Sequence, residues 1–420
     1  MKSINLFLIS AFFIGFISAD TILIKNAQIF DGDRDELFAS NILIEDKKIK
    51  RISTSSMQAD IVIDAENKIV TPGMIATDTE LGIVEIGSLS VTRDDSYSIY
   101  KIGFSVFDAF NPNSTLIPWN RSNGITSSLT LPRNTSSPIG GMGSFFVLDG
   151  NQKIEGKKDV VMVGNLGGRN NGSRAESLSV TEDLIELGKS ISRVEAESDD
   201  ELSRIIEDSA FAKNMELYPR DLKALYKLVN EGMPLIIKSN RASDILKLVD
   251  LKRKYDLNII IMGAQEAGLV ADEIAENDIP LIVNPINNIP DSFDELNSNI
   301  NMSMQLEKKG ITLMFNAPRD HNYHLIRQGA GVSVAHGMSY FGALKSITSN
   351  PAKVFSIENR GYIKPGMYAD ILIWDGDPLE PSSIPLKIFI NGEDIDLTTR
   401  SSMLRDRYIK DLDKPNTYRN

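Results

Sequence analysis

Two acidic residues, Asp78 and Glu80, stand two positions apart at the end of a predicted strand. Side chains at i and i+2 of a strand point the same way, so this spacing predicts two carboxylates side by side. Such a pair can bind a hard cation such as Mg²⁺ or Ca²⁺, or act as general acid and base. In the alternative interpretation, the two carboxylates only form ion pairs with a nearby cation.

Histidine and cysteine chemistry is restricted in this chain. There is no Cys, which excludes disulfides, thiolate nucleophiles and Cys-ligated metals. The three His residues, His321, His324 and His336, lie in one short segment, so distant strands cannot assemble a multi-His metal site. His321 and His324 follow a predicted strand and are candidates for substrate contact, the alternative being exposed loop residues.

The charge balance restricts the kinds of partner. Lys and Arg number 45 against 57 Asp and Glu, a formal net charge of −12 without long basic runs. This balance argues against nucleic acid or an anionic membrane surface as the main partner. The partner that we expect is a small-molecule ligand.

The first 19 residues have the pattern of a secretory signal peptide. One cation, Lys2, precedes an apolar stretch from Ile4 to Phe16, and Ala19 offers a small residue for cleavage. The stretch is shorter than the roughly 20 residues that span a bilayer, which disfavours an uncleaved anchor. We therefore expect cleavage after Ala19, no membrane span in the mature chain, and a periplasmic or secreted location; the lack of Cys favours the periplasm.

Elements that must position these residues follow from the hydrophobic pattern. Short strands near both ends, at 21–70 and 369–390, predict a small β-sandwich domain built from both termini. Between them, apolar strands alternate with amphipathic helices, which predicts a parallel sheet covered by helices. The predicted α/β fold is a TIM-like (β/α)₈ barrel at 74–356, a composite sandwich at 20–73 and 357–400, and a C-terminal tail at 401–420.

Five helices and four strands are predicted in the second half of the chain. Helices are expected at Asp221–Glu231, Ala242–Tyr255, Gln265–Asn277, Leu325–Gly337 and Tyr340–Thr348, and strands at Pro234–Lys238, Asn258–Met262, Pro280–Asn284 and Ile311–Asn316. The Gly- and Asn-rich segment 164–172 is predicted to be a loop.

Motifs at both ends of the middle region resemble those of a known family. Val70–Ile75 (VTPGMI) resembles the start of the barrel in the amidohydrolase superfamily. Ser349–Lys353 (SNPAK) and Gly361–Asp370 (GYIKPGMYAD) resemble its last barrel helix and its return into the terminal domain. The nearest branch by these motifs is related to imidazolonepropionase. The resemblance implies a hydrolase of carbon–nitrogen bonds, including non-peptide and cyclic amides, with one or two divalent metals activating water.

The family's metal ligands are four His and one Asp, and this chain departs from all five. The resemblance puts Asp78 and Glu80 at the first two positions, and Lys238, Gly263 and Pro318 at the others. We therefore expect no tightly bound zinc and assign no metal ligand; a divalent metal enters only through the family resemblance. Lys238 is expected to form an ion pair with Asp78 or Glu80 in place of the metal.

The same resemblance places the end of the Lys238 strand beside the pocket. Asn240 and Arg241 are therefore candidates for substrate binding, with Asp78, Glu80 and Lys238 as the catalytic candidates. Two functions stay open: an amidohydrolase-family hydrolase with a degenerate metal site, or an inactive periplasmic pseudoenzyme. The second would bind a ligand or serve as partner subunit of an intact amidohydrolase, in a homo-oligomer or hetero-oligomer.

Overall fold

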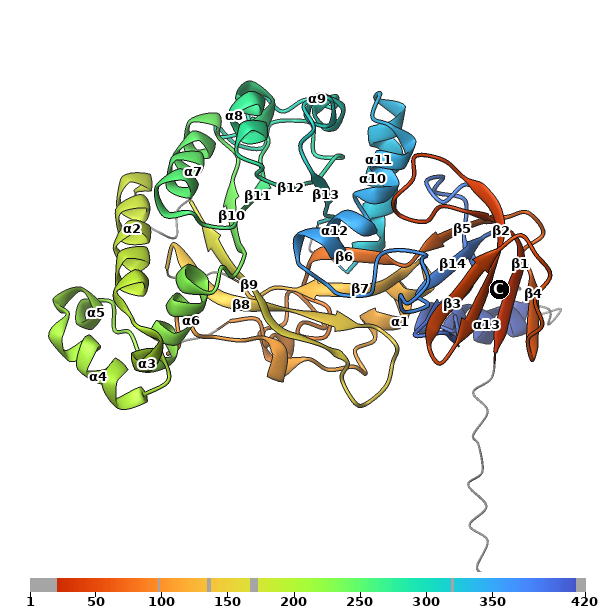
Figure 1. Cartoon of the computed structure of the whole chain (residues 1–420), viewed down its shortest axis with the longest axis horizontal. Helices are drawn as coiled ribbons and strands as arrows, with labels where there is room; N and C mark the ends of the chain where they lie inside the picture. Colours follow the sequence, from red (N-terminus) through yellow and green to blue (C-terminus); the bar gives the residue numbers. More distant parts are fainter. Residues whose placement is uncertain (1–20, 97–98, 134–136, 167–172, 319–320, 413–420) are drawn as a thin grey trace, which may run out of the picture.

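The computed structural model describes residues 21–96, 99–133, 137–166, 173–318 and 321–412. Two bodies of structure lie side by side (Figure 1). One is a sheet of red strands from the start of the chain and blue strands from its end. The other is a larger curved sheet with helices along its outside. The predicted signal peptide and residues 413–420 lie outside the described residues.

The first sheet is built from both ends of the chain, with the order β16-β15-β14-β5-β1-β2-β3 and β4 paired to β1. β5 joins the two ends, since Val70 pairs with Ile373 and Pro72 with Ile371 in antiparallel register. The strands form one hydrogen-bonded sheet, so the two-layer sandwich that the sequence predicted is not shown. The strands are β1 (Ile22–Ile29), β2 (Phe38–Glu45), β3 (Lys48–Ser53), β4 (Ile61–Asp64), β5 (Ile69–Pro72), β14 (Ile371–Trp374), β15 (Pro385–Ile390) and β16 (Glu393–Asp394).

Alternating apolar residues explain why these segments form a sheet with its own core. Ile42 and Ile44 of β2 are buried while their neighbours are partly exposed, the period-two pattern of a strand with one covered face. They pack with Ile24, Val70 and Phe389 from other strands, all fully buried. This core is separate from that of the larger sheet.

The second sheet has eight strands in the order β13-β12-β11-β10-β9-β8-β7-β6 and curves into a nearly closed barrel. Its two edge strands approach each other, since Thr77 Oγ1 of β6 donates a hydrogen bond to the Phe315 carbonyl of β13 at 3.2 Å. The strands are β6 (Met74–Thr79), β7 (Ile125–Thr130), β8 (Ile139–Val147), β9 (Gly156–Asn165), β10 (Leu235–Ser239), β11 (Ile259–Gly263), β12 (Leu281–Val283) and β13 (Leu313–Phe315).

One strand departs from the all-parallel barrel that the sequence predicted. β8 runs antiparallel to both β7 and β9, and no described helix separates these three strands. The connections, residues 131–138 and 148–155, are shorter than the dozen or so residues that a parallel crossover needs. Connections this short can join antiparallel strands, as in a hairpin. The predicted (β/α)₈ pattern is therefore wrong for β7, β8 and β9.

Helices cover the outside of the remaining strands (Figure 1). α6 and α7 agree with the predicted helices, but the predicted helix at Gln265–Asn277 is split in two, a 3₁₀ turn and α8. Gly268 lies in that turn and is a poor helix former.

The helices are η1 (Ser90–Thr92), η2 (Phe107–Ala109), α1 (Leu116–Ser122), α2 (Arg174–Ser190), α3 (Arg193–Ala196), α4 (Asp199–Asp208), α5 (Ala210–Asn214), α6 (Pro219–Asn230), α7 (Ala242–Tyr255), η3 (Ala267–Val270), α8 (Ala271–Glu276), α9 (Met302–Lys308), η4 (Tyr323–Leu325), α10 (Ile326–Ala335), α11 (Tyr340–Lys345), α12 (Ser349–Val354) and α13 (Arg400–Leu412).

Two remaining predictions concern single segments. In the predicted 164–172 loop, Gly164 and Asn165 end β9, and residues 167–172 lie outside the described part. The predicted tail contains α13. Across the described ranges, no helix is both long and apolar enough to cross a membrane.

Candidate active site

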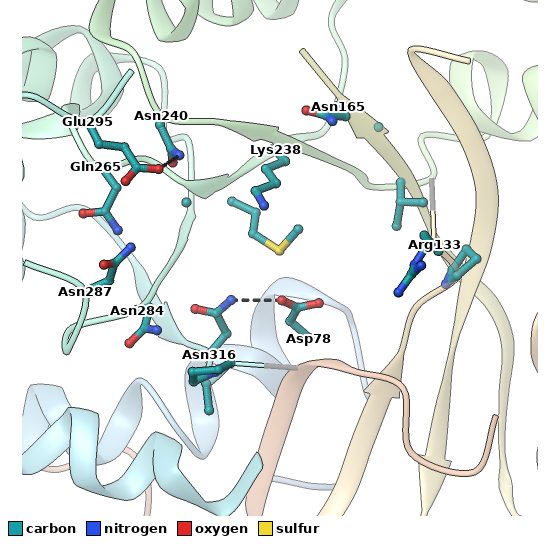
Figure 2. A pocket seen from close by; sticks show the side chains of 17 residues that line it. Asp78, Arg133, Asn165, Lys238, Asn240, Gln265, Asn284, Asn287, Glu295 and Asn316 are labelled. Carbon is teal, nitrogen blue, oxygen red and sulfur yellow. Dashed lines mark hydrogen bonds between the residues drawn. The ribbon is translucent and has the colours of Figure 1, made fainter. Parts of the chain in front are cut away.

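A cavity of about 450 Å³ opens where the barrel strands end. The carboxyl ends of β6, β9, β10 and β11 and the loops after β7, β12 and β13 line it, the position at which barrel enzymes carry their active sites. Its polar lining side chains are Asp78, Arg133, Asn165, Lys238, Asn240, Gln265, Asn284, Asn287, Glu295 and Asn316 (Figure 2).

Asp78 belongs to β6, whose residues are all buried, and its side chain reaches the cavity wall. The residue is 7% exposed, and Asn316 Nδ2 donates a hydrogen bond of 2.9 Å to its Oδ2 atom. Asn316 directly follows β13, at the other edge of the barrel sheet. Near-closure of the barrel therefore brings together two residues that are far apart in the sequence.

Glu80 does not share the surroundings of Asp78. Its Oε1 atom lies 3.1 Å from Arg93 Nη2, and its backbone N–H donates to the Tyr323 hydroxyl at 3.0 Å. Hydrogen bonding to Asp95 and the charge of Glu80 raise the pKa of Arg93 against the opposing effect of burial. β6 ends at Thr79, so the strand alternation that predicted two parallel carboxylates stops one residue too early. Glu80 does not line the cavity.

Lys238 lies near the end of β10 and points into the cavity (Figure 2). Within the described ranges it forms no ion pair with a carboxylate. The predicted ion pair between Lys238 and Asp78 or Glu80 is therefore wrong. Arg93 is the cation beside Glu80, and the Asn316 amide contacts Asp78.

Asn240 and Arg241 follow β10 but turn in different directions. Asn240 lines the cavity and donates through Nδ2 to Glu295 Oε1 at 2.5 Å. Arg241 Nη2 instead contacts Asp244 Oδ1 at 2.6 Å, in the first turn of α7. This ion pair draws the guanidinium of Arg241 towards the helix, and the residue is not part of the cavity wall.

His321 and His324 contact helix α1 rather than the cavity. Asn120 of α1 donates through Nδ2 to the His321 carbonyl at 2.8 Å, and its Oδ1 lies 3.2 Å from His324 Nδ1. The rings of His324 and Trp119 are perpendicular to each other, with 5.4 Å between their centroids. The structure thus brings Asp78, Lys238 and Asn240 to one cavity and leaves Glu80, Arg241, His321 and His324 outside its lining.

Sequence reasoning missed the other polar residues of the cavity. Asn165, Asn284 and Asn316 each stand at or directly after the end of a buried strand: β9, β12 and β13. An amide residue at the end of an apolar strand was the signal that could have identified them. The carboxyl ends of parallel strands meet at one edge of a sheet, so such residues gather at the same site. Gln265, Asn287 and Glu295 come from loops and gave no such signal.

The donors around the cavity do not fit the metal centre that the family resemblance implies. Gly263 stands at the fourth ligand position of that centre and adopts a φ of +92°. A Cβ atom at Gly263 would lie 2.3 Å from Asn240 Oδ1. Any larger side chain would have to displace Asn240. Lys238 brings an ammonium group where the family has an imidazole. We derive no step through a metal.

A nearly closed barrel with a polar cavity at its strand ends is a scaffold typical of enzymes. Residues 201–399 match the model of the amidohydrolase family. The crystal structure of an amidohydrolase from Thermotoga maritima MSB8 superposes with a TM-score of 0.75 at 20% identity, covering 89% of this chain and 99% of the other. The chain therefore shares the fold of this amidohydrolase, and its second half is similar in sequence to the amidohydrolase family.

Two curated proteins are similar in sequence. Amidohydrolase tasK of Hapsidospora irregularis is 23% identical over 422 residues, which cover 88% of this chain and 42% of tasK. The 5-methylthioadenosine/S-adenosylhomocysteine deaminase of Pyrococcus furiosus is 37% identical over 70 residues, 16% of this chain and 17% of that enzyme. The chain spans less than half the length of the curated relatives it matches.

Proposed function

We propose that this chain is an amidohydrolase-type hydrolase that cleaves carbon–nitrogen bonds of small polar amides, non-peptide or cyclic, in the barrel cavity. The observation that carries the proposal is the placement of Asp78. It is a buried carboxylate at the end of the first barrel strand, it lines the cavity, and Asn316 holds its orientation. We assign the chain to the imidazolonepropionase-related branch, with a degenerate metal site.

In this proposal Asp78 is the general base. Its carboxylate takes a proton from water while the water oxygen attacks the carbonyl carbon of the amide. The carbon–nitrogen bond then breaks, and the proton passes from the Asp78 carboxyl group to the departing nitrogen, which leaves as an amine. Protons balance over the cycle, and Asp78 returns as a carboxylate. The amide side chains of Asn165 and Asn284 can hydrogen-bond the substrate.

A second candidate function is ligand binding without turnover, as a pseudoenzyme or as partner subunit of an intact amidohydrolase. The residues at the expected ligand positions favour it, because Lys238 and Gly263 supply neither imidazole nor carboxylate. In that case Asp78 would not act as a base, and removing its charge would leave the affinity for the ligand unchanged.

The test is hydrolysis of a panel of linear and cyclic amides by purified protein, before and after dialysis against a chelator. We expect activity that survives chelation and falls about a hundredfold or more in Asp78→Asn. Glu36→Gln, an exposed carboxylate in the terminal region, is the matched control and should retain full activity. Binding of a panel member without any cleavage would favour the second function, and activity lost with a chelated metal would contradict the mechanism.

Metal content can be measured on the same protein. We expect elemental analysis after dialysis to show far less than one zinc per chain, because zinc sites of this kind need several imidazole and carboxylate ligands. About one zinc per chain would contradict this expectation.

We further propose that the protein is periplasmic or secreted. The support is the apolar segment from Ile4 to Phe16 with Ala19 behind it. N-terminal sequencing of protein recovered from the periplasm or medium should begin at Asp20, and a chain beginning at Met1 would contradict cleavage.

A further inference from the structure

Two cationic side chains line the cavity, Arg133 on one side and Lys238 nearer its middle (Figure 2). The Arg133 side chain is 55% exposed, and its Nε lies 3.5 Å from Asp95 Oδ2. Asp95 is already bound by Arg93, whose Nη2 and Nε atoms lie 2.6 and 3.2 Å from its two oxygens. Asp95 therefore neutralises Arg133 only in part, while Lys238 has no carboxylate partner within the described part of the chain.

Hydrogen-bond acceptors gather on the opposite side. Glu295 is 8% exposed and accepts from Asn240 Nδ2 at 2.5 Å and from the Asp291 N–H at 3.3 Å. No cation pairs with it across the described ranges. Beside it, Gln265 is 3% exposed, and its Oε1 atom, like Oδ1 of Asn240, is buried and accepts no hydrogen bond. A buried acceptor without a donor costs free energy, and a turn of the Gln265 amide towards a ligand N–H would recover it.

Figure 2 separates these two groups across the cavity. Glu295 and Gln265 lie on one side, Arg133 lies on the other, and Lys238 and Asp78 lie between them. The wall therefore has two poles of opposite character, with amide side chains between the poles.

We infer that the cavity binds a small bipolar molecule, with a carboxylate or similar anion at Lys238 and Arg133 and an amino or other N–H-rich group at Glu295 and Gln265. The inference rests on the proposed function, since it names the substrate class of the same site. The amide bond of such a molecule would lie between the poles, where Asp78 reaches the wall.

Ligands with a single charge satisfy only half of this wall. A simple anion would meet Lys238 and leave the Glu295 carboxylate without a cation and the Gln265 carbonyl without a donor. A simple amine would meet Glu295 and leave Lys238 and Arg133 without an anion. Because charge complementarity mainly sets specificity, a molecule with both ends is preferred over either half.

The test uses four forms of one backbone: glycylglycine, N-acetylglycylglycine, glycylglycinamide and N-acetylglycylglycinamide. Glycylglycine carries both terminal charges and N-acetylglycylglycine only the carboxylate. Glycylglycinamide carries only the amine charge, and N-acetylglycylglycinamide carries neither. Isothermal titration of the wild-type protein should give the lowest Kd for glycylglycine, with loss of either charge raising Kd about tenfold or more. Equal affinity for all four forms, or no binding of any form at millimolar concentration, would overturn the inference.

Variants then assign each end. Lys238→Met should weaken the two carboxylate-bearing forms about tenfold and leave glycylglycinamide unchanged, and Glu295→Gln should do the converse. Because Glu295 also holds its own loop, Gln265→Met provides a second variant on that side. Lys247→Met on α7 and Glu276→Gln on α8 are controls outside the cavity.

Failure of this inference can be told apart from failure of the proposed function. Binding is measured whether or not a probe is cleaved, so charge-selective binding without hydrolysis of any amide contradicts only the hydrolase proposal. Hydrolysis of uncharged amides as fast as charged ones, with no effect of Lys238→Met on Kd or KM, contradicts only the bipolar site.

Discussion

At the scale of single residues, neighbouring carboxylates in this protein have different surroundings. Asp78 lies within β6 and reaches the cavity, where the amide of Asn316, directly after β13, donates a hydrogen bond to it. Glu80 lies beyond the strand end and contacts Arg93 and Tyr323. The proposed mechanism accordingly gives the chemistry to Asp78, and we propose that Glu80 holds the loop after β6.

The assignment of Glu80 predicts an effect on stability. Glu80→Gln removes the charge that faces the nearly buried Arg93, so we expect the free energy of unfolding to fall by about 1–3 kcal/mol. Urea unfolding followed by circular dichroism measures it, with Glu36→Gln as control. A variant that is as stable as wild type but inactive would instead make Glu80 part of the chemistry.

The assignment of Asn316 predicts an effect on activity. Asn316→Leu removes the donor that holds Asp78, so kcat for the amide substrate should fall about tenfold or more with little change in KM. Asn316→Gln keeps an amide and should recover part of the loss. An Asn316→Gln variant as slow as Asn316→Leu would contradict the role of the amide donor.

At the scale of elements, Glu266 connects the start of α7 to the loop that carries Glu295. Its Oε2 atom accepts from the N–H of Ala242, the first residue of α7, at 3.0 Å. Its Oε1 atom accepts from Asn297 Nδ2 at 2.9 Å. Burial opposes ionisation of Glu266, but these hydrogen bonds outweigh it and lower the pKa of the carboxyl group.

This geometry predicts a pH-dependent contribution to stability. A lowered pKa means that the folded protein favours the charged form, so the stabilisation is complete above the ordinary pKa of 4.5 and is lost as pH falls through the lower folded-state value. Glu266→Gln should therefore lower the free energy of unfolding by about 1–3 kcal/mol at neutral pH. Urea titrations in acid should show the two proteins converging, and a difference that persists there would contradict the assignment.

At the scale of the whole molecule, Arg360 joins the terminal sheet to the barrel. The residue is 4% exposed and pairs with Asp370, just before β14, and with Glu155, in the connection between β8 and β9. It also donates to Asn391 Oδ1 at 2.8 Å, and its guanidinium lies 4.3 Å from the ring centroid of Tyr368. One buried cation thus contacts residues from both parts of the fold.

Loss of this cation should destabilise the whole protein. Arg360→Met leaves Asp370, which is 5% exposed, without its ion-pair partner, and breaking a buried pair in this way costs about 3–5 kcal/mol. Calorimetry should show a lower Tm than in the control Arg51→Ala, which changes an exposed arginine of β3. A Tm equal to that of the control would mean that Arg360 contributes nothing net.

Local patterns in the sequence were sufficient for several elements. Helix α7 begins and ends where predicted, and the strands that became β10 to β13 were placed within about two residues. These elements could be read because burial of one face leaves a periodic trace in neighbouring residues. No strand was predicted at β7, β8 or β9, so the antiparallel course of β8 was not foreseen.

The cavity itself depended on tertiary structure. Asp78 and Asn316 are separated by 238 positions, and only the approach of β6 and β13 makes them neighbours. The single residue by which β6 stops short of Glu80 decided that this carboxylate meets Arg93 instead of Lys238. Such contacts leave no periodic trace along the chain, because the partner of each polar side chain is set by the register and closure of distant strands.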